Sequence, residues 1–326
     1  MSYRSCLVSV CGGGRAYLPP PGTPGAGPGY YGDGESVVDE TPRAADPVDS
    51  ESAEWLGALA GRGAQREAAL ARLHEMLLRI AQRECRRRGP RLRITGPELE
   101  DLAYQAGADA LVAITGKLGQ FRGESRFTTW AYKFVIFEVS DKIGRHFWQN
   151  PGVPMDAEEW DKLPDRFGFD PAREAEWRDL LVALRRAVDT ELSPRQRQVF
   201  VAIVVNAVPL DALVIELGSN RNAIYKTMFD ARRKLRAALA ANGYMGHDIS
   251  GALMNGYSEL DRFLQTDPRD VGCAKAIKIL HVYAELVAAG EPAEQRYPGV
   301  AAHLQACGPC GEDFEGLLHA LRDETS

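Results

Sequence analysis

The chain has 326 residues, of which 45% are hydrophobic and 26% are charged, with a formal net charge of −6. This composition is that of an ordinary globular protein with room for two or three domains, and no apolar run reaches the roughly 20 residues that a membrane span needs. Because no basic start precedes an apolar core, we expect no signal peptide, no membrane partner and a cytoplasmic location.

The N-terminal residues 1–52 are rich in Gly and Pro and are predicted to be a disordered tail. Helices are expected over residues 53–150. Apolar residues recur at spacings of three and four near the start of this region, and further helices are expected at about 98–118 and from near 125 to before 150. The last of these carries an aromatic stripe, formed by Phe127, Trp130, Phe134 and Phe137.

Four prolines mark residues 151–178 as a linker, and residues 179–243 return to a helical pattern. Ser193 and Pro194 form a good helix start, with Ser as the N-cap and Pro at the first helical position. A second linker is expected over 244–262, followed by a small helical domain over 263–326 whose last helical segment ends in a His/Cys cluster. Convincing strand patterns are absent, so the predicted fold class is all-α.

A helix-turn-helix is predicted between residues 210 and 236. A short apolar helix ends at Gly218, which suits a sharp turn, and the next helix opens with Arg and Asn, whose donors match base edges. Residues 193–236 hold 8 basic and 3 acidic residues, which favours phosphate binding over the alternative, a plain helical hairpin with solvated charges. The residues expected to face DNA are Arg221, Asn222, Tyr225, Lys226 and Arg232, with Tyr225, Lys226 and Arg232 facing outward.

The charge distribution supports the same interpretation. Residues 1–52 carry a net charge of −4 and residues 246–326 a net charge of −7, which leaves +5 on the middle of the chain. A basic middle between acidic ends suits a nucleic-acid binder whose flanks can shield it.

A second candidate surface runs from Phe121 to Tyr132, where a basic, Gly-containing loop leads into a helix with several aromatic residues. Aromatic rings beside arginines can stack on bases that leave a duplex. On composition alone, the alternative that this stripe is hydrophobic core is the stronger of the two.

Together these segments resemble the extracytoplasmic-function (ECF) sigma factors of bacterial RNA polymerase. Residues 121–132 (FRGESRFTTWAY) are similar to the promoter-melting segment of that family, and residues 192–239 are similar to its C-terminal promoter domain. The resemblance covers about residues 55–242. It implies two helical domains, region 2 at 53–150 and region 4 at 179–243, that bind core RNA polymerase and promoter DNA and perform no catalysis themselves.

The resemblance also implies roles for individual residues. Asp101, Leu102 and Gln105 would dock on core polymerase, although Tyr104 stands where many family members have Gln. Region 4 would contact the minus-thirty-five element through Arg221, Asn222, Tyr225 and Lys226. The residues expected near the minus-ten DNA are Arg122, Phe127, Trp130, Lys133, Arg145 and His146.

A third pattern joins Cys273 to His303, Cys307 and Cys310. The two last thiols form a Cys-x2-Cys half-site, and His303 lies four residues earlier, so that it would face the same way on a continuing helix. Cys273 is the natural fourth ligand and His281 is a rival, while a chance pair of reduced thiols is the alternative to a site. The pattern resembles zinc-binding anti-sigma domains, which implies one Zn²⁺ ion and a possible contact with the sigma domains.

The sequence therefore predicts a sigma factor that directs promoter-specific initiation and is regulated in cis by its zinc domain. One rival is a helix-turn-helix regulator that does not bind polymerase, in which residues 121–130 would be core. The other is a zinc enzyme, but a closed set of four ligands favours a structural ion, and we expect no enzymatic activity.

Overall fold

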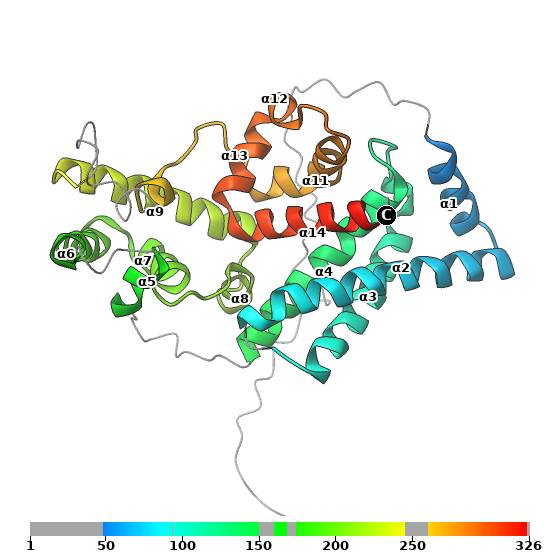
Figure 1. Ribbon diagram of the computed structural model, residues 1–326, viewed down its shortest axis with the longest axis horizontal. Coiled ribbons are helices and arrows are strands. Elements are labelled where there is room, and N and C mark those ends of the chain that lie inside the picture. The colour runs from blue at the N-terminus through cyan, green and yellow to red at the C-terminus, as the bar shows by residue number, and fades with distance from the viewer. Residues whose placement is uncertain (1–47, 93, 150–159, 168–173, 245–259, 325–326) are drawn as a thin grey trace, which may run out of the picture.

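The computed structural model describes residues 48–92, 94–149, 160–167, 174–244 and 260–324, and every regular element in these ranges is a helix (Figure 1). The predicted all-α class is thus confirmed for the described residues. Most of the predicted N-terminal tail lies outside them, and the first helix already begins at Ser50. None of the described helices is long and apolar enough to cross a membrane.

The first part of the fold consists of four helices and two short 3₁₀ turns. The helices are α1 (Ser50–Ala60), α2 (Ala64–Arg88), α3 (Pro97–Gly116) and α4 (Phe127–Gln149), and the turns are Gly89–Leu92 and Leu118–Gln120. α2, α3 and α4 pack pairwise around a core that contains Leu73, Leu77, Ile114 and Phe137, all almost completely buried. The periodic apolar residues of α2 face this core, as their spacing predicts.

The second part contains the helix-turn-helix pair. Its elements are a 3₁₀ turn (Trp160–Lys162), α5 (Leu163–Arg166), α6 (Glu174–Glu191), α7 (Pro194–Phe200), a π-helical turn (Val201–Val205), α8 (Leu210–Glu216) and α9 (Arg221–Ala241). Ser193 caps α7 in a complete capping box with Gln196, and Pro194 follows at the first helical position, as predicted. Part of the predicted 151–178 linker is integrated here, because Trp160 and Leu163 are buried in this core.

The third part, which we call the C-terminal segment, comprises residues 260–324. A helical turn over 260–264 contributes Leu260 and Leu264 to the core of the second part. Four helices follow: α11 (Gly272–Ala288), α12 (Ala293–Arg296), α13 (Pro298–Ala306) and α14 (Gly308–Glu324). The expectation that the last helical segment ends in the His/Cys cluster is wrong, because α14 begins there and runs on to Glu324.

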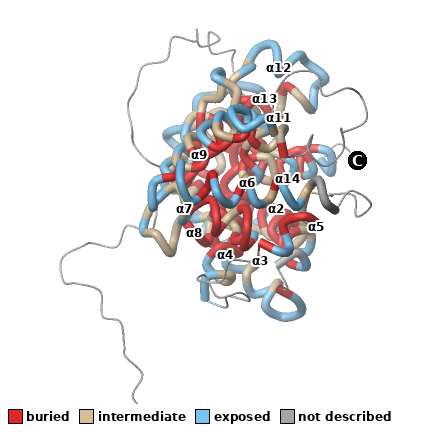
Figure 2. Tube along the Cα trace, turned by 90° about the vertical axis from the view of Figure 1, so that its left-hand side faces the viewer, coloured by how far each residue is buried: buried red, intermediate tan, exposed pale blue. Residues whose placement is uncertain are grey.

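The C-terminal segment packs between the two other parts (Figure 1). α11 and α14 lie against α4, and their residues Leu280, Leu317 and Leu321 join the core of the first part. α14 approaches so closely at Gly316 that a Cβ there would lie 2.7 Å from the Glu84 carboxylate. Figure 2 shows buried residues of α2, α4 and α8 gathered in the interior between these elements.

Candidate metal centre and candidate nucleic-acid interface

The four predicted metal ligands come together in space. The ligand atoms of Cys273, His303, Cys307 and Cys310 all lie within 4.8 Å of one another, and all four residues are buried. Three come from helix ends, Cys273 from the first turn of α11, His303 from the last turn of α13 and Cys310 from the first turn of α14, and Cys307 lies between α13 and α14. A buried Cys₃His set matches a closed structural zinc site.

The local backbone differs from the predicted continuing helix. α13 ends at Ala306, and Cys307 adopts an extended backbone conformation, while its amide still donates to the His303 carbonyl over 2.8 Å. A new helix, α14, starts at Gly308. Because the helix is interrupted here, His303 at the end of α13, Cys307 between the two helices and Cys310 in α14 can approach one centre.

Two observations fit these residues to a bound metal ion. Nε2 of His303 is buried and has no hydrogen-bond partner within the described chain, while its other nitrogen, Nδ1, lies 2.9 Å from the Asp270 carboxylate. A metal-ligating His usually has such an outer-shell carboxylate, which orients the ring. The three thiols also share hydrogen bonds, which hold the pKa of Cys307 well below 9.0 and raise the pKa of Cys273. A hydrogen bond with Cys273 lowers the pKa of Cys310, but Cys307 and burial outweigh it and raise this pKa to about 11, so metal binding would release protons from this cluster.

His281, the rival fourth ligand, lies outside the cluster. It belongs to α11 but its Nδ1 lies 3.1 Å from Nζ of Lys133 on α4, and both side chains are buried. Burial, and next the charge of Lys133, lowers the pKa of His281 well below 6.5, so the ring is neutral. The structure therefore places Cys273, and not His281, with the other three ligands.

The helix-turn-helix residues predicted to read DNA are largely covered. Tyr225 and Arg232 are 4% and 3% exposed, so the expectation that both face outward is wrong. They face away from the core of their own domain, but the C-terminal segment lies on them. Of the remaining residues, Arg221 is also buried, Asn222 is half-buried, and Lys226 is exposed.

Hydrogen bonds and an ion pair join the C-terminal segment to Tyr225, Arg232 and Arg221. The Tyr225 hydroxyl donates to the Asp270 carboxylate, and Arg232 donates to the carbonyls of Phe263 and Gln265. Arg221 Nη1 lies 2.5 Å from Oδ2 of Asp313 on α14. Three side chains with donors suited to nucleic acid therefore contact acceptors of the C-terminal segment, and Arg221 in addition donates through Nε and Nη2 to the Asp211 carboxylate of α8.

The predicted minus-ten surface is buried in a similar way. Phe127 and Trp130 are core residues, and their rings pack with Phe121 and Phe134 at centroid distances between 4.7 and 5.9 Å. The structure thus favours the core interpretation of the aromatic stripe. Lys133 is buried against α11, whereas Arg122 and Arg145 are exposed and His146 is half-buried.

Residues beside this stripe also bind the C-terminal segment. The backbone amide and the guanidinium of Arg126 both donate to Glu285 of α11 over 2.8 Å, and the Tyr132 hydroxyl donates to Glu324 of α14. The acidic C-terminal segment therefore contacts both predicted DNA-binding domains through carboxylates.

The predicted polymerase-docking surface stays open. Asp101 and Gln105 are exposed on α3, and Leu102 is half-buried beneath them. Tyr104 is 54% exposed on the same helix, an unusual position for a large aromatic side chain.

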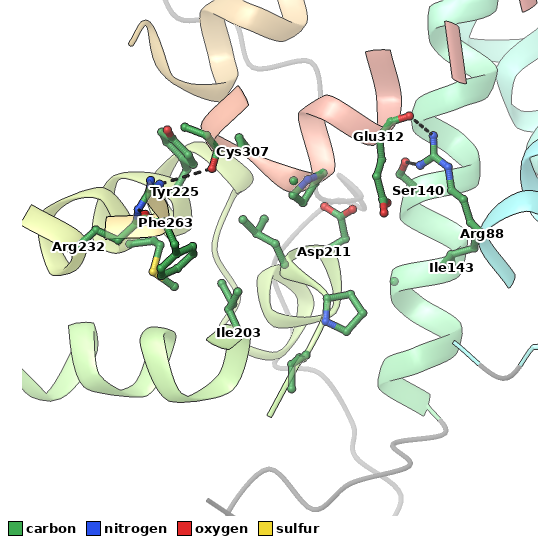
Figure 3. A pocket seen from close by; sticks show the side chains of 18 residues that line it. Arg88, Ser140, Ile143, Ile203, Asp211, Tyr225, Arg232, Phe263, Cys307 and Glu312 are labelled. Carbon is green, nitrogen blue, oxygen red and sulfur yellow. Dashed lines mark hydrogen bonds between the residues drawn. The ribbon is translucent and has the colours of Figure 1, made fainter. Parts of the chain in front are cut away.

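A cavity of about 510 Å³ lies where the three parts meet (Figure 3). Arg232 lies on one side of it and donates to the Ala306 carbonyl over 3.4 Å, while Arg88 lies on the other and donates to the Glu312 carbonyl over 3.2 Å. Apolar side chains of Ile143, Ile203 and other residues line the space between them. The two arginines thus donate to the backbone at the end of α13 and in the first part of α14 from opposite sides of the cavity.

Sequence analysis missed the carboxylates that make these contacts, above all Asp313, which is completely buried. One signal was available, because Asp313 falls on the apolar stripe of α14 between Cys310 and Leu317. A lone acidic residue at such a position indicates a buried ionic partner. Asp270 and Glu285 carry no comparable signal.

Comparisons with family models, with curated proteins and with solved structures gave no match to this chain.

Proposed function

We propose that this protein is a sigma factor of the extracytoplasmic-function type, whose C-terminal segment carries a zinc centre and regulates promoter binding in cis. Core RNA polymerase would supply the catalysis, and this chain would select the promoter and assist strand opening. The proposal rests on the observation that acidic residues and carbonyls of the C-terminal segment contact Arg221, Tyr225 and Arg232, three of the side chains predicted to contact DNA.

The charge distribution supports regulation by masking, in which the C-terminal segment covers side chains that would otherwise bind DNA. Residues 246–326 carry a net charge of −7, whereas the middle of the chain carries +5. Phosphate binding depends on free Lys and Arg side chains, so the pairing of Arg126 with Glu285 lowers the DNA affinity of this arrangement. Arg221 pairs with Asp313 of the C-terminal segment and also with Asp211 of its own domain, so only the contact with Asp313 belongs to the masking. We call the arrangement in which the C-terminal segment covers α9 the closed arrangement. We infer that it binds DNA weakly and that function requires the C-terminal segment to move away from α9.

The exposed surface of α3 supports polymerase binding from the closed state. Asp101 and Gln105 are accessible while the predicted DNA-binding residues are covered. On this proposal the chain docks on core polymerase first, and DNA binding follows once the C-terminal segment moves.

One observation favours the rival, a helix-turn-helix regulator that acts without polymerase. That rival expects Phe127 and Trp130 to be core, and both are buried in this state. The two functions differ in one requirement, because only a sigma factor needs core polymerase for sequence-selective DNA binding.

The test is co-purification of the full chain with core RNA polymerase, followed by run-off transcription on genomic fragments. We expect a stable complex and transcripts that start at defined sites only when this chain is added. The matched variants are Gln105→Lys on the exposed face of α3 and Arg178→Gln on the exposed face of α6; the first should weaken the complex and the second should not. Selective duplex binding without any affinity for core polymerase would instead support the regulator.

A further inference from the structure

The DNA-reading helix α9 forms part of the surroundings of the metal cluster. The ring of Tyr225 packs edge-on against the ring of His303, with centroids 4.5 Å apart. Its hydroxyl binds the same Asp270 carboxylate whose other oxygen lies beside Nδ1 of His303. In addition, Sγ of Cys273 lies 3.8 Å from the backbone carbonyl oxygen of Arg221, the first residue of α9.

Arg232, also on α9, adds an electrostatic link. Its guanidinium is buried and donates to three backbone carbonyls, and it forms no ion pair with a carboxylate among the described residues. One of these carbonyls belongs to Ala306, which directly precedes Cys307. A buried cation is costly without a counter-charge nearby.

The Asp270 carboxylate is one such counter-charge, and the metal-ligand set can supply another. A divalent ion held by three thiolates and one neutral imidazole carries one net negative charge. Metal occupancy would therefore hold a fixed negative charge near Arg232 and would fix His303, which Asp270 connects to Tyr225.

From this geometry we propose that Tyr225 and Asp270 are positioning residues of the metal centre, so that metal binding and the covering of α9 stabilise each other. The ion holds the C-terminal segment on the DNA-reading helix, and the covered helix in turn completes the outer shell of the metal site. Linkage of this kind is reciprocal, because a contact made only in the closed state must strengthen both events by the same factor. Its regulatory consequence rests on the proposed function, but the linkage itself does not.

The experiment measures the Zn²⁺ affinity of the full chain by competition with a chromophoric chelator, without polymerase or DNA. Tyr225→Phe removes the hydroxyl and keeps the ring, and Lys226→Gln alters the exposed neighbour on the same helix. Because outer-shell partners change metal affinity by about 10–100-fold, we expect Tyr225→Phe to weaken Zn²⁺ binding by roughly 10-fold and Lys226→Gln to leave it unchanged. Circular dichroism establishes that both variants are folded.

A second variant and a second readout keep the test decisive. Asp270→Asn should weaken Zn²⁺ binding at least as much as Tyr225→Phe, and removing Zn²⁺ from the wild-type chain should speed hydrogen exchange in residues 263–272, which cover Tyr225 and Arg232. Zn²⁺ affinities equal to wild type in both folded variants would overturn the proposal. Hydrogen exchange in residues 263–272 at the same rate with and without Zn²⁺ would also overturn it. Failure here leaves polymerase binding untouched, so it is distinguishable from failure of the proposed function.

Discussion

Arg221, the first residue of α9, forms a buried ion pair with Asp313 of α14. The other Asp313 oxygen accepts from Arg88 of α2 over 3.0 Å and from the Ser140 hydroxyl of α4 over 2.6 Å. Burial opposes the charged form of Asp313, but the charges of Arg221 and Arg88 outweigh it and hold its pKa below 3.8. A single carboxylate thus joins all three parts of the fold.

Replacing Asp313 by Asn should destabilise the closed arrangement. The change keeps the shape and removes the carboxylate charge that Arg88 and Arg221 share, while Arg88 keeps its ion pair with Glu84 and Arg221 keeps its ion pair with Asp211. Because neither guanidinium is left without a carboxylate, we expect a loss of about 1–3 kcal/mol, less than for a buried pair that is broken completely. Urea unfolding of the full chain measures the loss. Glu315→Gln is the matched control on the same helix, since Glu315 is exposed and its pair with Arg87 should contribute less than about 1 kcal/mol. Equal effects of the two changes would contradict the role of Asp313.

Replacing Trp130 by Ala should lower the free energy of unfolding. Trp130 is 5% exposed and packs among three other aromatic rings, so its removal should cost about 3–5 kcal/mol of unfolding free energy. Thermal melting compares it with Tyr104→Ala, a change at an exposed aromatic residue that should stay within about 0.5 kcal/mol of wild type. A Trp130→Ala chain as stable as wild type would show that the aromatic stripe is not core.

The contact between Lys133 and His281 predicts a loss of stability in acid. His281 is neutral when folded, with a pKa well below the 6.5 of the unfolded chain, so unfolding takes up a proton below pH 6.5. The unfolding free energy should therefore fall as the pH drops through this range, by at most about 1.4 kcal/mol per pH unit from this group. Burial also lowers the pKa of Lys133 to about 8 from 10.5, so its contribution likewise increases as the pH rises, between 8 and 10.5.

Denaturant unfolding between pH 5 and 7 tests this dependence. His281→Gln should flatten the pH profile relative to wild type, whereas His319→Gln, at an exposed position on α14, should leave it unchanged. Parallel profiles for wild type and His281→Gln would show that His281 is not the group responsible.

Metal binding predicts a clear difference between two buried cysteines. Cys307→Ser removes a ligand and should abolish tight binding of one Zn²⁺ ion per chain, while Cys85→Ser, in the core of the first part, should keep it. Metal analysis after dialysis and the Co²⁺–thiolate absorption bands report the occupancy and the ligand set. Full Zn²⁺ occupancy in Cys307→Ser would exclude this residue from the site.

Local patterns predicted most of the fold. The spacing of Leu73 and Leu77 gave α2, the Ser193–Pro194 pair gave the start of α7, and the Cys-x2-Cys spacing with His303 gave the metal ligands, because each depends on residues close in sequence. The identity of the fourth ligand needed the structure, since Cys273 and His281 lie on one helix and only tertiary packing separates them.

The covering of α9 was not predictable in detail. Helical periodicity places Tyr225 and Arg232 outside the core of their own domain, and it contains no information about a segment that returns from residues 263–313 to lie on them. Net charges of opposite sign suggested an attraction, but the partners Asp270, Glu285 and Asp313 are single side chains whose positions depend on how three parts assemble.

The most direct test of masking compares transcription by core polymerase with the wild-type chain and with the full-length variant Gly316→Val. A Cβ at Gly316 would lie 2.7 Å from Glu84 and 3.1 Å from Ile136, so the larger side chain should push α14 away from α2 and α4. Gly308→Ala is the control, because a Cβ there meets no atom within 4 Å. A chain truncated after Tyr244 provides a second, independently opened form. We predict more promoter-selective transcript from Gly316→Val and from the truncated chain than from wild type or Gly308→Ala, whereas equal yields from all four folded proteins would contradict masking by the C-terminal segment.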